Sequence, residues 1–168
     1  SYGYLADKLG KKEIAGQYTQ KAKEMAVEWE RMANDGDHYK LTFDKSGTWS
    51  QKYNLVWDKL MNWQIFPEQI VKTEIPYYLT KQNRYGLPLD NRQTYTKTDW
   101  IMWTATLAPD KATFEEFIEP VYLFMNETTD RIPMSDWVFT DKPEHRAFQA
   151  RSVVGGYFIK MLENKMNN

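Results

Sequence analysis

Three aspartates occupy places where the chain could carry out acid and base chemistry. Asp90, Asp99 and Asp136 lie in, or directly after, polar stretches rich in aromatic residues. Two neighbouring carboxylates can activate a water molecule and protonate a leaving group, as hydrolysis of an amide or a glycosidic bond requires. We therefore treat these three as candidate catalytic residues. The alternative for each is a structural role, as a helix cap or as the partner of a cation.

The same stretches carry side chains suited to holding a polar substrate. Arginine binds a carboxylate through two parallel hydrogen bonds, lysine binds it as a point charge, and aromatic faces pack against flat ligands. The candidate substrate-binding residues are Trp49, Lys52, Arg92, Tyr95, Lys97, Trp100, Trp137 and Arg151. The alternative is that the cations pair with the aspartates and that the aromatic rings fill gaps between packed helices.

Residue types exclude or disfavour several other classes of site. The chain contains no cysteine, which excludes disulfides, thiolate metal ligands and a cysteine nucleophile. Its two histidines, His38 and His145, are far apart in the sequence and do not make a zinc site. We expect no bound metal and no cofactor.

Charge and hydropathy restrict the partners. Lysine and arginine number 22 against 23 aspartates and glutamates, so the formal net charge is -1. No basic surplus is available to neutralise a phosphate backbone, and we expect no nucleic acid partner. No apolar run approaches the roughly 18 to 20 residues needed to cross a bilayer. The partner expected from the candidate residues is a small-molecule or carbohydrate substrate.

Amphipathic helices form one class of predicted element. Residues 11–34 carry apolar side chains every three or four positions, with lysine and glutamate between them. A second such segment starts at Pro67, which suits a first helical turn, and a third follows Asp110, a plausible N-cap. Between the first two, residues 38–43 alternate enough to allow a short strand.

A second class of predicted helix is apolar on more than one face. Residues 53–63, 98–108 and 148–162 have this character, so we expect helices that are buried on most sides. Gly155 and Gly156 in the last of them are expected to let two helices approach closely, at a cost in helix propensity.

The alternation of these two classes predicts an architecture. Helical hairpins stacked side by side, with one helix inside and one outside, give such an alternation at a period of about 45 residues. The fold class is therefore all-α, one domain over residues 1–168 that forms part of an α/α toroid, with an ordinary helical bundle as the alternative. The loops before the buried helices, residues 47–52, 85–97 and 130–147, would then converge on one cleft.

Three motifs in these places resemble a known family. They are GTWSQKYNLVWDK at residues 47–59, YGLPLDNRQTYTKTDW at residues 85–100 and FQARSVVGGYFIK at residues 148–160. They resemble the C-terminal domain of the fungal glutaminase A family and its relatives in gut Bacteroidetes, over nearly the whole chain. The resemblance implies an (α/α)6 toroid like that of the six-hairpin glycosidases. It also implies that the chain is the C-terminal portion of a larger multidomain hydrolase, which is secreted or periplasmic. The family segment that reads like Asp-Leu-Tyr-Asp-Thr is Ser-Asp-Trp-Val-Phe-Thr at residues 135–140 here, which leaves substrate choice open.

Three functions are consistent with these residues. The resemblance favours an L-glutamine amidohydrolase, in which an arginine holds the α-carboxylate and an aspartate assists water. The first alternative is part of a glycoside hydrolase acting on a polysaccharide, and the second is a non-catalytic half of a scaffold, whose exposed apolar surface would make the isolated chain a homodimer. In each case the isolated chain is expected to be inactive without the remaining domains of its parent.

Overall fold

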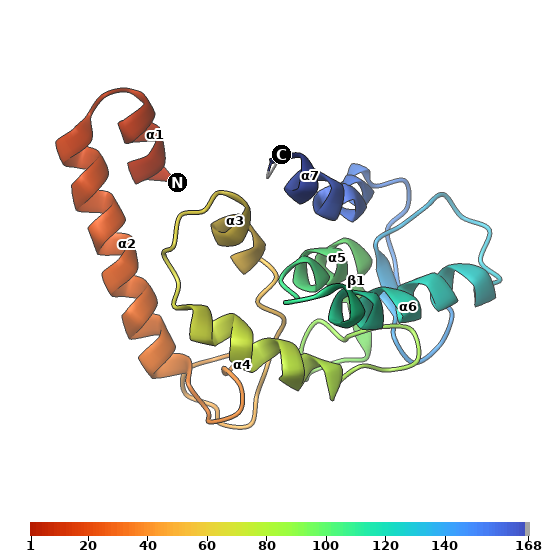
Figure 1. Ribbon diagram of the computed structural model, residues 1–168. Helices are drawn as coiled ribbons and strands as arrows, with labels where there is room; N and C mark the ends of the chain where they lie inside the picture. Colours follow the sequence, from red (N-terminus) through yellow and green to blue (C-terminus); the bar gives the residue numbers. More distant parts are fainter. Residues whose placement is uncertain (167–168) are drawn as a thin grey trace.

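The protein is described by a computed structural model that covers residues 1–166, and these fold mainly as helices (Figure 1). The elements in chain order are α1 (Tyr2–Lys8), α2 (Lys12–Ala33), α3 (Leu55–Leu60), α4 (Glu68–Leu79), β1 (Tyr95–Lys97), α5 (Thr98–Thr106), α6 (Lys111–Glu127), β2 (Trp137–Phe139), the 3-10 helix η1 (Ser152–Phe158) and α7 (Ile159–Met166). Within residues 1–166, no helix has both the length and the apolar character that a membrane span needs.

The helices form an outer and an inner set. In Figure 1, α2, α4 and α6 lie along the left, lower and right-hand sides of the molecule, α3 and α5 lie between them, and α1 and α7 lie along the upper edge. Helix α1 packs against α2 and α5 packs against α6, and α5 also contacts α3, β1, η1 and α7. The predicted helical hairpins are thus present, and α5 lies at their centre. Closure of the hairpins into a ring stays a prediction.

The outer helices begin and end close to where the sequence places them. Helix α2 occupies nearly all of residues 11–34, and its buried side consists of Ala15, Ala26 and Ala33. Asp110 caps α6 as predicted, because its carboxylate accepts a hydrogen bond of 2.8 Å from the backbone N–H of Thr113. Such a cap contributes about 1 kcal/mol to stability.

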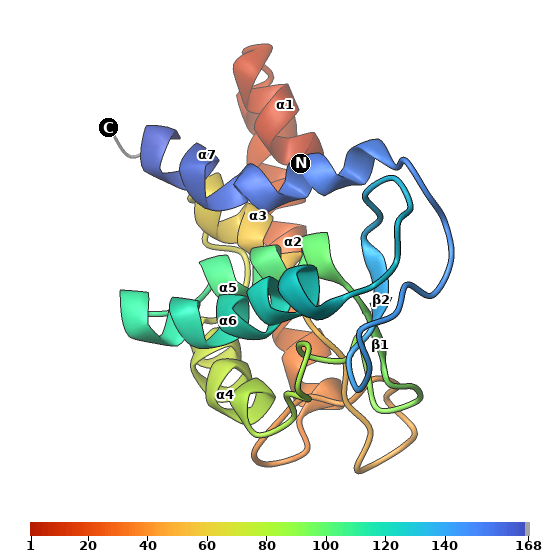
Figure 2. The same cartoon turned by 90° about the vertical axis from the view of Figure 1, so that its right-hand side faces the viewer.

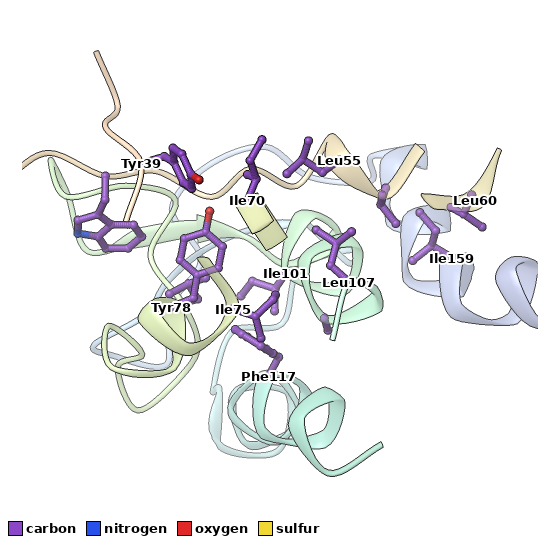
Figure 3. Close-up of a cluster of buried hydrophobic side chains, with 14 of the residues drawn as sticks. Tyr39, Leu55, Leu60, Ile70, Ile75, Tyr78, Ile101, Leu107, Phe117 and Ile159 are labelled. Carbon is purple, nitrogen blue, oxygen red and sulfur yellow. The ribbon is translucent and has the colours of Figure 1, made fainter. Parts of the chain in front are cut away.

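Apolar side chains from inner and outer helices form one main core (Figure 3). Val56, Ile70, Ile101 and Phe117 are completely buried in it and come from four different helices. Each side chain of this size contributes roughly 1.5 to 3 kcal/mol when it is fully removed from water. The core therefore fixes α3, α4, α5 and α6 relative to one another.

The three long loops lie side by side, as the hairpin architecture predicts. The backbone N–H of Gln51 donates to the carbonyl of Leu89 at 2.9 Å, which joins the first loop to the second. The second and third loops contribute β1 and β2, which form a two-stranded antiparallel sheet, seen at the right of Figure 2. Its register pairs Thr96 with Val138. The sheet is an addition to the all-helical fold that the sequence predicted.

The short strand predicted at residues 38–43 is wrong. Tyr39 forms a single bridge with Asn34, and its backbone N–H donates to the buried carboxylate of Glu74 at 2.6 Å. A strand would need that N–H for a neighbouring backbone carbonyl. The glutamate therefore holds this segment in an irregular conformation.

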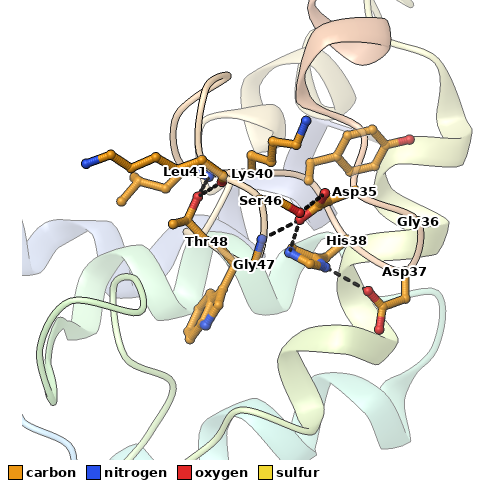
Figure 4. A network of polar contacts seen from close by, with 12 residues as sticks. Asp35, Gly36, Asp37, His38, Lys40, Leu41, Ser46, Gly47 and Thr48 are labelled. Carbon is orange, nitrogen blue, oxygen red and sulfur yellow. Dashed lines mark hydrogen bonds and ion pairs between the residues drawn. The ribbon is translucent and has the colours of Figure 1, made fainter.

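A polar network closes the turn that follows α2 (Figure 4). Asp35 accepts hydrogen bonds from the hydroxyl of Ser46 at 2.7 Å and from the backbone N–H of Gly47 at 2.6 Å. His38 lies between two carboxylates, with Nδ1 2.7 Å from Asp37 and Nε2 3.4 Å from Asp35. His38 thus has a structural place in this turn.

Residues 148–162 do not form the single buried helix that the sequence predicted. Residues 152–158 form the 3-10 helix η1, in which no residue is buried, and the α-helix starts only at Ile159. Gly155 and Gly156 lie in the middle of η1 and disfavour an α-helix there. Phe158, next to the α-helix, is 63% exposed.

Candidate functional site

Two of the predicted aspartates come together at the start of α5. Asp99 is the second residue of α5, and Asp136 directly precedes β2. The backbone N–H and the hydroxyl of Thr98 both donate to the carbonyl of Asp136, at 2.8 and 3.1 Å. Asp99 is 4% exposed and Asp136 is 2% exposed. The end of the small sheet thus places two buried carboxyl groups beside each other.

The two carboxyl groups have different electrostatic surroundings. Lys97 Nζ lies 2.9 Å from Asp136 Oδ2, and Arg151 Nη1 lies 3.8 Å from the same oxygen. Among residues 1–166, no cationic side-chain nitrogen lies within 4.0 Å of the Asp99 carboxylate. Burial raises the pKa of Asp99 from 3.8 to about 6, and the negative charge of Asp136 adds to this effect. One carboxylate is therefore held as an ion pair, while the other exchanges its proton near neutral pH.

Aromatic rings surround the ion pair. Lys97 Nζ lies 4.6 Å from the ring centre of Trp137 and 4.8 Å from that of Phe148. Arg151 also lies over the ring of Phe148, with its guanidinium carbon 4.7 Å from the ring centre. Tyr95 packs edge-on against Trp137 at 5.4 Å. The contacts of Lys97 and Arg151 are cation–π geometries.

Helix η1 covers the pair. A Cβ added to Gly156 would lie 3.0 Å from the Asp99 Cβ and 2.9 Å from Trp103 Nε1, so a glycine is needed for η1 to approach α5. The expected close approach is therefore confirmed for Gly156, whereas Gly155 faces open space. The hydroxyl of Tyr157 forms a short hydrogen bond with Thr98. Partial burial raises the pKa of Tyr157 to about 12, so its hydroxyl keeps its proton.

Several buried polar atoms here make no hydrogen bond within the described residues. They are Lys97 Nζ, Asp99 Oδ1, Trp103 Nε1, Asp136 Oδ1 and Trp137 Nε1. Lys97 belongs to this set although its Nζ forms an ion pair with Asp136 at 2.9 Å, and an ammonium group has three N–H donors. Buried polar atoms in proteins almost always have partners. These three donors and two acceptors match a polar ligand that can both accept and donate hydrogen bonds.

Two predicted site residues pair with each other instead. Arg92 donates to Asp90 in a two-pronged contact, from Nε at 2.9 Å and from Nη2 at 2.7 Å. Burial opposes ionisation of Asp90, but the hydrogen bonds and charge of Arg92 outweigh it and lower the pKa of Asp90. Asp90 and Arg92 therefore have a structural role in the second loop.

Trp49 and Lys52 also serve the fold. Trp49 is 7% exposed and belongs to the main core, next to the rings of Tyr77 and Tyr78. Lys52 Nζ donates to the carbonyls of Tyr39 and Ser50, and burial lowers its pKa. The first loop thus supports the other two loops and brings no catalytic group to the pair.

Trp100 lies at a cavity beside the carboxylate pair. It stacks face to face on Tyr53, with ring centres 4.1 Å apart and planes 7° apart. Both rings line a cavity of about 530 Å³, together with Lys52 and Asp90. Burial and the charge of Asp99 raise the pKa of Tyr53, which shows that this wall lies near the carboxylate pair.

Two further aspartates have structural partners. Asp58 accepts hydrogen bonds from the backbone N–H groups of Ile65 and Phe66, at 3.1 and 3.0 Å, and so holds the loop after α3. Asp130 accepts from the backbone and the ring of His145, at 2.7 and 2.9 Å. Among residues 1–166, no group of three acidic, histidine or cysteine side chains could hold a metal ion.

Sequence reasoning missed two residues of the cluster, Trp103 and Tyr157. Trp103 lies four positions after Asp99 and so shares its face of α5, a spacing that could have identified it. Tyr157 reaches the pair because residues 152–158 form a 3-10 helix, whereas an α-helix was expected there.

Comparison with known proteins finds similarity to glutaminases. The chain is 27% identical over 165 residues to Glutaminase A of Aspergillus oryzae, covering 94% of this chain and 24% of the relative. It is 26% identical over 174 residues to a probable glutaminase of Arthroderma benhamiae, covering 84% of this chain and 20% of that relative. The chain thus spans less than a quarter of the length of these curated relatives. No solved structure matches it. A family model, described as the glutaminase A six helical-hairpin domain, matches residues 1–161, and the chain therefore belongs to this family.

Proposed function

We propose that this chain is one part of a longer L-glutamine amidohydrolase, in which Asp99 carries the proton and Asp136 positions the neighbouring Lys97. The observation that carries the proposal is the buried pair itself, in which Asp136 is held by Lys97 while the pKa of Asp99 is raised to about 6. Carboxyl groups with different surroundings in one site are typical of acid and base roles. Membership of the glutaminase A family favours an amide as the bond that is cleaved.

Asp99 is the general base of the proposed reaction. A carboxylate with a pKa of about 6 is ionised at neutral pH and still accepts a proton readily. It takes one proton from a water molecule, whose oxygen forms a bond with the δ-carbon of glutamine. Asp99 then gives this proton to the amide nitrogen, the carbon–nitrogen bond breaks, and ammonia leaves. The products are glutamate and ammonia.

Lys97 is the proposed electrostatic partner of the reaction. Negative charge develops on the δ-oxygen of the substrate as water attacks, and preorganised donors in a site without bulk water stabilise it strongly. Lys97 Nζ is buried, positively charged and without a hydrogen bond in the described structure, so it can donate to this oxygen. Asp136 holds Lys97 in place through the contact of 2.9 Å.

Access to the pair requires movement of its cover. Residues 148–158 lie over Asp99 and Asp136, yet no residue of η1 is buried. Phe148 and Ala150, at the start of this segment, have left-handed backbones with φ of 58° and 52°. Such a conformation is unfavourable for residues other than glycine. We infer that this segment opens to admit the substrate and closes during the reaction.

The experiment is an ammonia-release assay on the full-length protein with L-glutamine. We expect Asp99→Asn to lower kcat by about 100-fold or more, the usual contribution of a general base. Asp110→Asn is the matched control, because asparagine caps α6 as well as aspartate does. In the wild type, kcat/KM should fall as the pH drops below about 6, since Asp99 becomes protonated. Equal activity of both variants would remove Asp99 from the reaction.

One observation favours the glycoside hydrolase alternative. The stacked rings of Tyr53 and Trp100 line a cavity large enough for a sugar ring, near the carboxylate pair. A screen of polysaccharides against the full-length protein would test this alternative, and release of sugar without release of ammonia would favour it over the amidohydrolase. A secreted or periplasmic location stays a prediction.

A further inference from the structure

One face of the small sheet leads to the carboxylate pair. Thr96 and Val138 are buried on the other face, so Tyr95, Lys97, Trp137 and Phe139 share this one. Lys97 stands at the end of the face, where it contacts Asp136. The face is thus a continuous surface of aromatic rings that ends at the proposed reaction centre.

Arg146 lies on this face in a fixed position. Its backbone N–H donates to the carbonyl of Trp137 at 2.9 Å, and the preceding residue, His145, bridges Val138. The guanidinium carbon lies 5.6 Å from the ring centres of Tyr95, Trp137 and Phe139. An arginine stacked on rings keeps its N–H donors available in the plane of the guanidinium.

Within the part of the chain that the structure describes, Arg146 differs from the other arginines because its side chain has neither an acidic partner nor a backbone acceptor. Arg31 pairs with Glu28, Arg84 with Glu127 and Arg92 with Asp90, Arg151 approaches Asp136, and Arg131 donates to backbone carbonyls. Within residues 1–166, no carboxylate oxygen lies within 4.0 Å of the side-chain nitrogens of Arg146. The side chain is exposed. It is therefore a preorganised fork ready for a carboxylate from outside the described chain.

The position of Arg146 suits one end of an amino acid substrate. Lys97 is paired with Trp137 in the sheet register, and Tyr95 is paired with Phe139 two residues further along. Two residues of a strand span about 7 Å, so Arg146, above these rings, lies several ångströms along the strand from Lys97. The two methylene groups of glutamine separate its carboxamide from its α-carboxylate by a comparable length.

We propose that Arg146 binds the α-carboxylate of the substrate while the carboxamide lies at Asp99 and Lys97. This inference rests on the proposed function and deepens it, because it makes the substrate an amino acid with a free α-carboxylate. Arg92 and Arg151, the candidate arginines from the sequence, instead pair with Asp90 and face Asp136 at 3.8 Å, respectively. Arg146 is thus the residue that decides between free glutamine and a carboxyl-blocked amide.

The test compares L-glutamine with L-glutaminamide, in which an amide replaces the α-carboxylate, on the full-length protein. The wild type should prefer glutamine. Arg146→Gln should lower kcat/KM for glutamine by about 10- to 100-fold, mainly through KM, because a charged hydrogen bond is lost. It should leave kcat/KM for glutaminamide unchanged, so the preference disappears. Arg146→Lys should restore part of it, and Arg131→Gln, a control from the same loop, should keep it.

A binding measurement separates failure of this inference from failure of the proposed function. Calorimetric titration of the Asp99→Asn protein with L-glutamate needs no turnover, and Arg146→Gln should weaken binding by a similar factor. Activity lost in Asp99→Asn with the substrate preference unaltered in Arg146→Gln would overturn the Arg146 inference alone. A preference abolished by Arg151→Gln would also overturn it. A protein that neither hydrolyses glutamine nor binds glutamate would overturn both.

Discussion

Replacement of Asp99 by asparagine should make the protein more stable while it makes the protein inactive. Burial and the charge of Asp136 raise the pKa of Asp99 from 3.8 to about 6. This is a difference of about two pKa units, and each unit corresponds to about 1.4 kcal/mol, so ionised Asp99 costs the folded protein up to about 3 kcal/mol. Asparagine cannot ionise and removes this cost.

The sign depends on pH in a defined way. Because the pKa is higher in the folded state, the folded protein binds more protons than the unfolded chain between about pH 4 and pH 6. The contribution of Asp99 to stability is therefore complete below about pH 4 and is lost as the pH rises through about 6. We expect Asp99→Asn to exceed the wild type by up to about 3 kcal/mol near pH 8 and by less than about 1 kcal/mol near pH 4.

The assay is urea unfolding followed by far-UV circular dichroism, for both proteins at a series of pH values. The free energy of unfolding is extrapolated to zero urea, and equal slopes show that the two unfolded states are comparable. A variant that is less stable than the wild type near pH 8, or a difference that does not grow with pH, would refute the burial argument. In that case the buried environment would not raise the pKa of Asp99.

Three other changes should act in known directions. Asp136→Asn should destabilise the protein by about 3 to 5 kcal/mol, since Lys97 would be left as a buried, unpaired charge; thermal unfolding measures this, and an effect below 1 kcal/mol would contradict it. Asp58→Ala should cost about 1 to 3 kcal/mol because two backbone N–H groups lose their acceptor; Asp58→Asn, which keeps one acceptor, should cost less in the same urea titration. Gly156→Ala should push η1 away from α5, since its Cβ would meet Asp99 and Trp103. Faster amide hydrogen exchange in η1 than in the wild type, with unchanged exchange in α6, would show this. An exchange rate in η1 equal to that of the wild type would argue against it.

The fold was predictable where a local pattern decides the outcome. Apolar spacing identified α2, and the capping position of Asp110 identified the start of α6. These features depend on residues within one turn or one adjoining loop, and such contacts are visible in a sequence.

The rest depended on contacts between distant segments. The strand expected at residues 38–43 does not form because the backbone N–H of Tyr39 donates to Glu74, which is more than thirty positions away in the sequence. Trp49 went into the core because Tyr77 and Tyr78 lie beside it. The pairing of Asp90 with Arg92 was a local alternative open from the start, and only the side-chain geometry decided in its favour.

The site separates the groups that hold the carboxylates from the segment that covers them. Backbone hydrogen bonds join the second and third loops at the pair, so Asp99 and Asp136 keep their relation whatever lies above them. The cover, residues 148–158, has no buried residue in η1 and begins with two strained backbones. Segments with few buried contacts open at a lower free energy than the core. Opening would let water lower the pKa of Asp99, and closure around a substrate would raise it again, so that the base becomes strongest when the amide is in place.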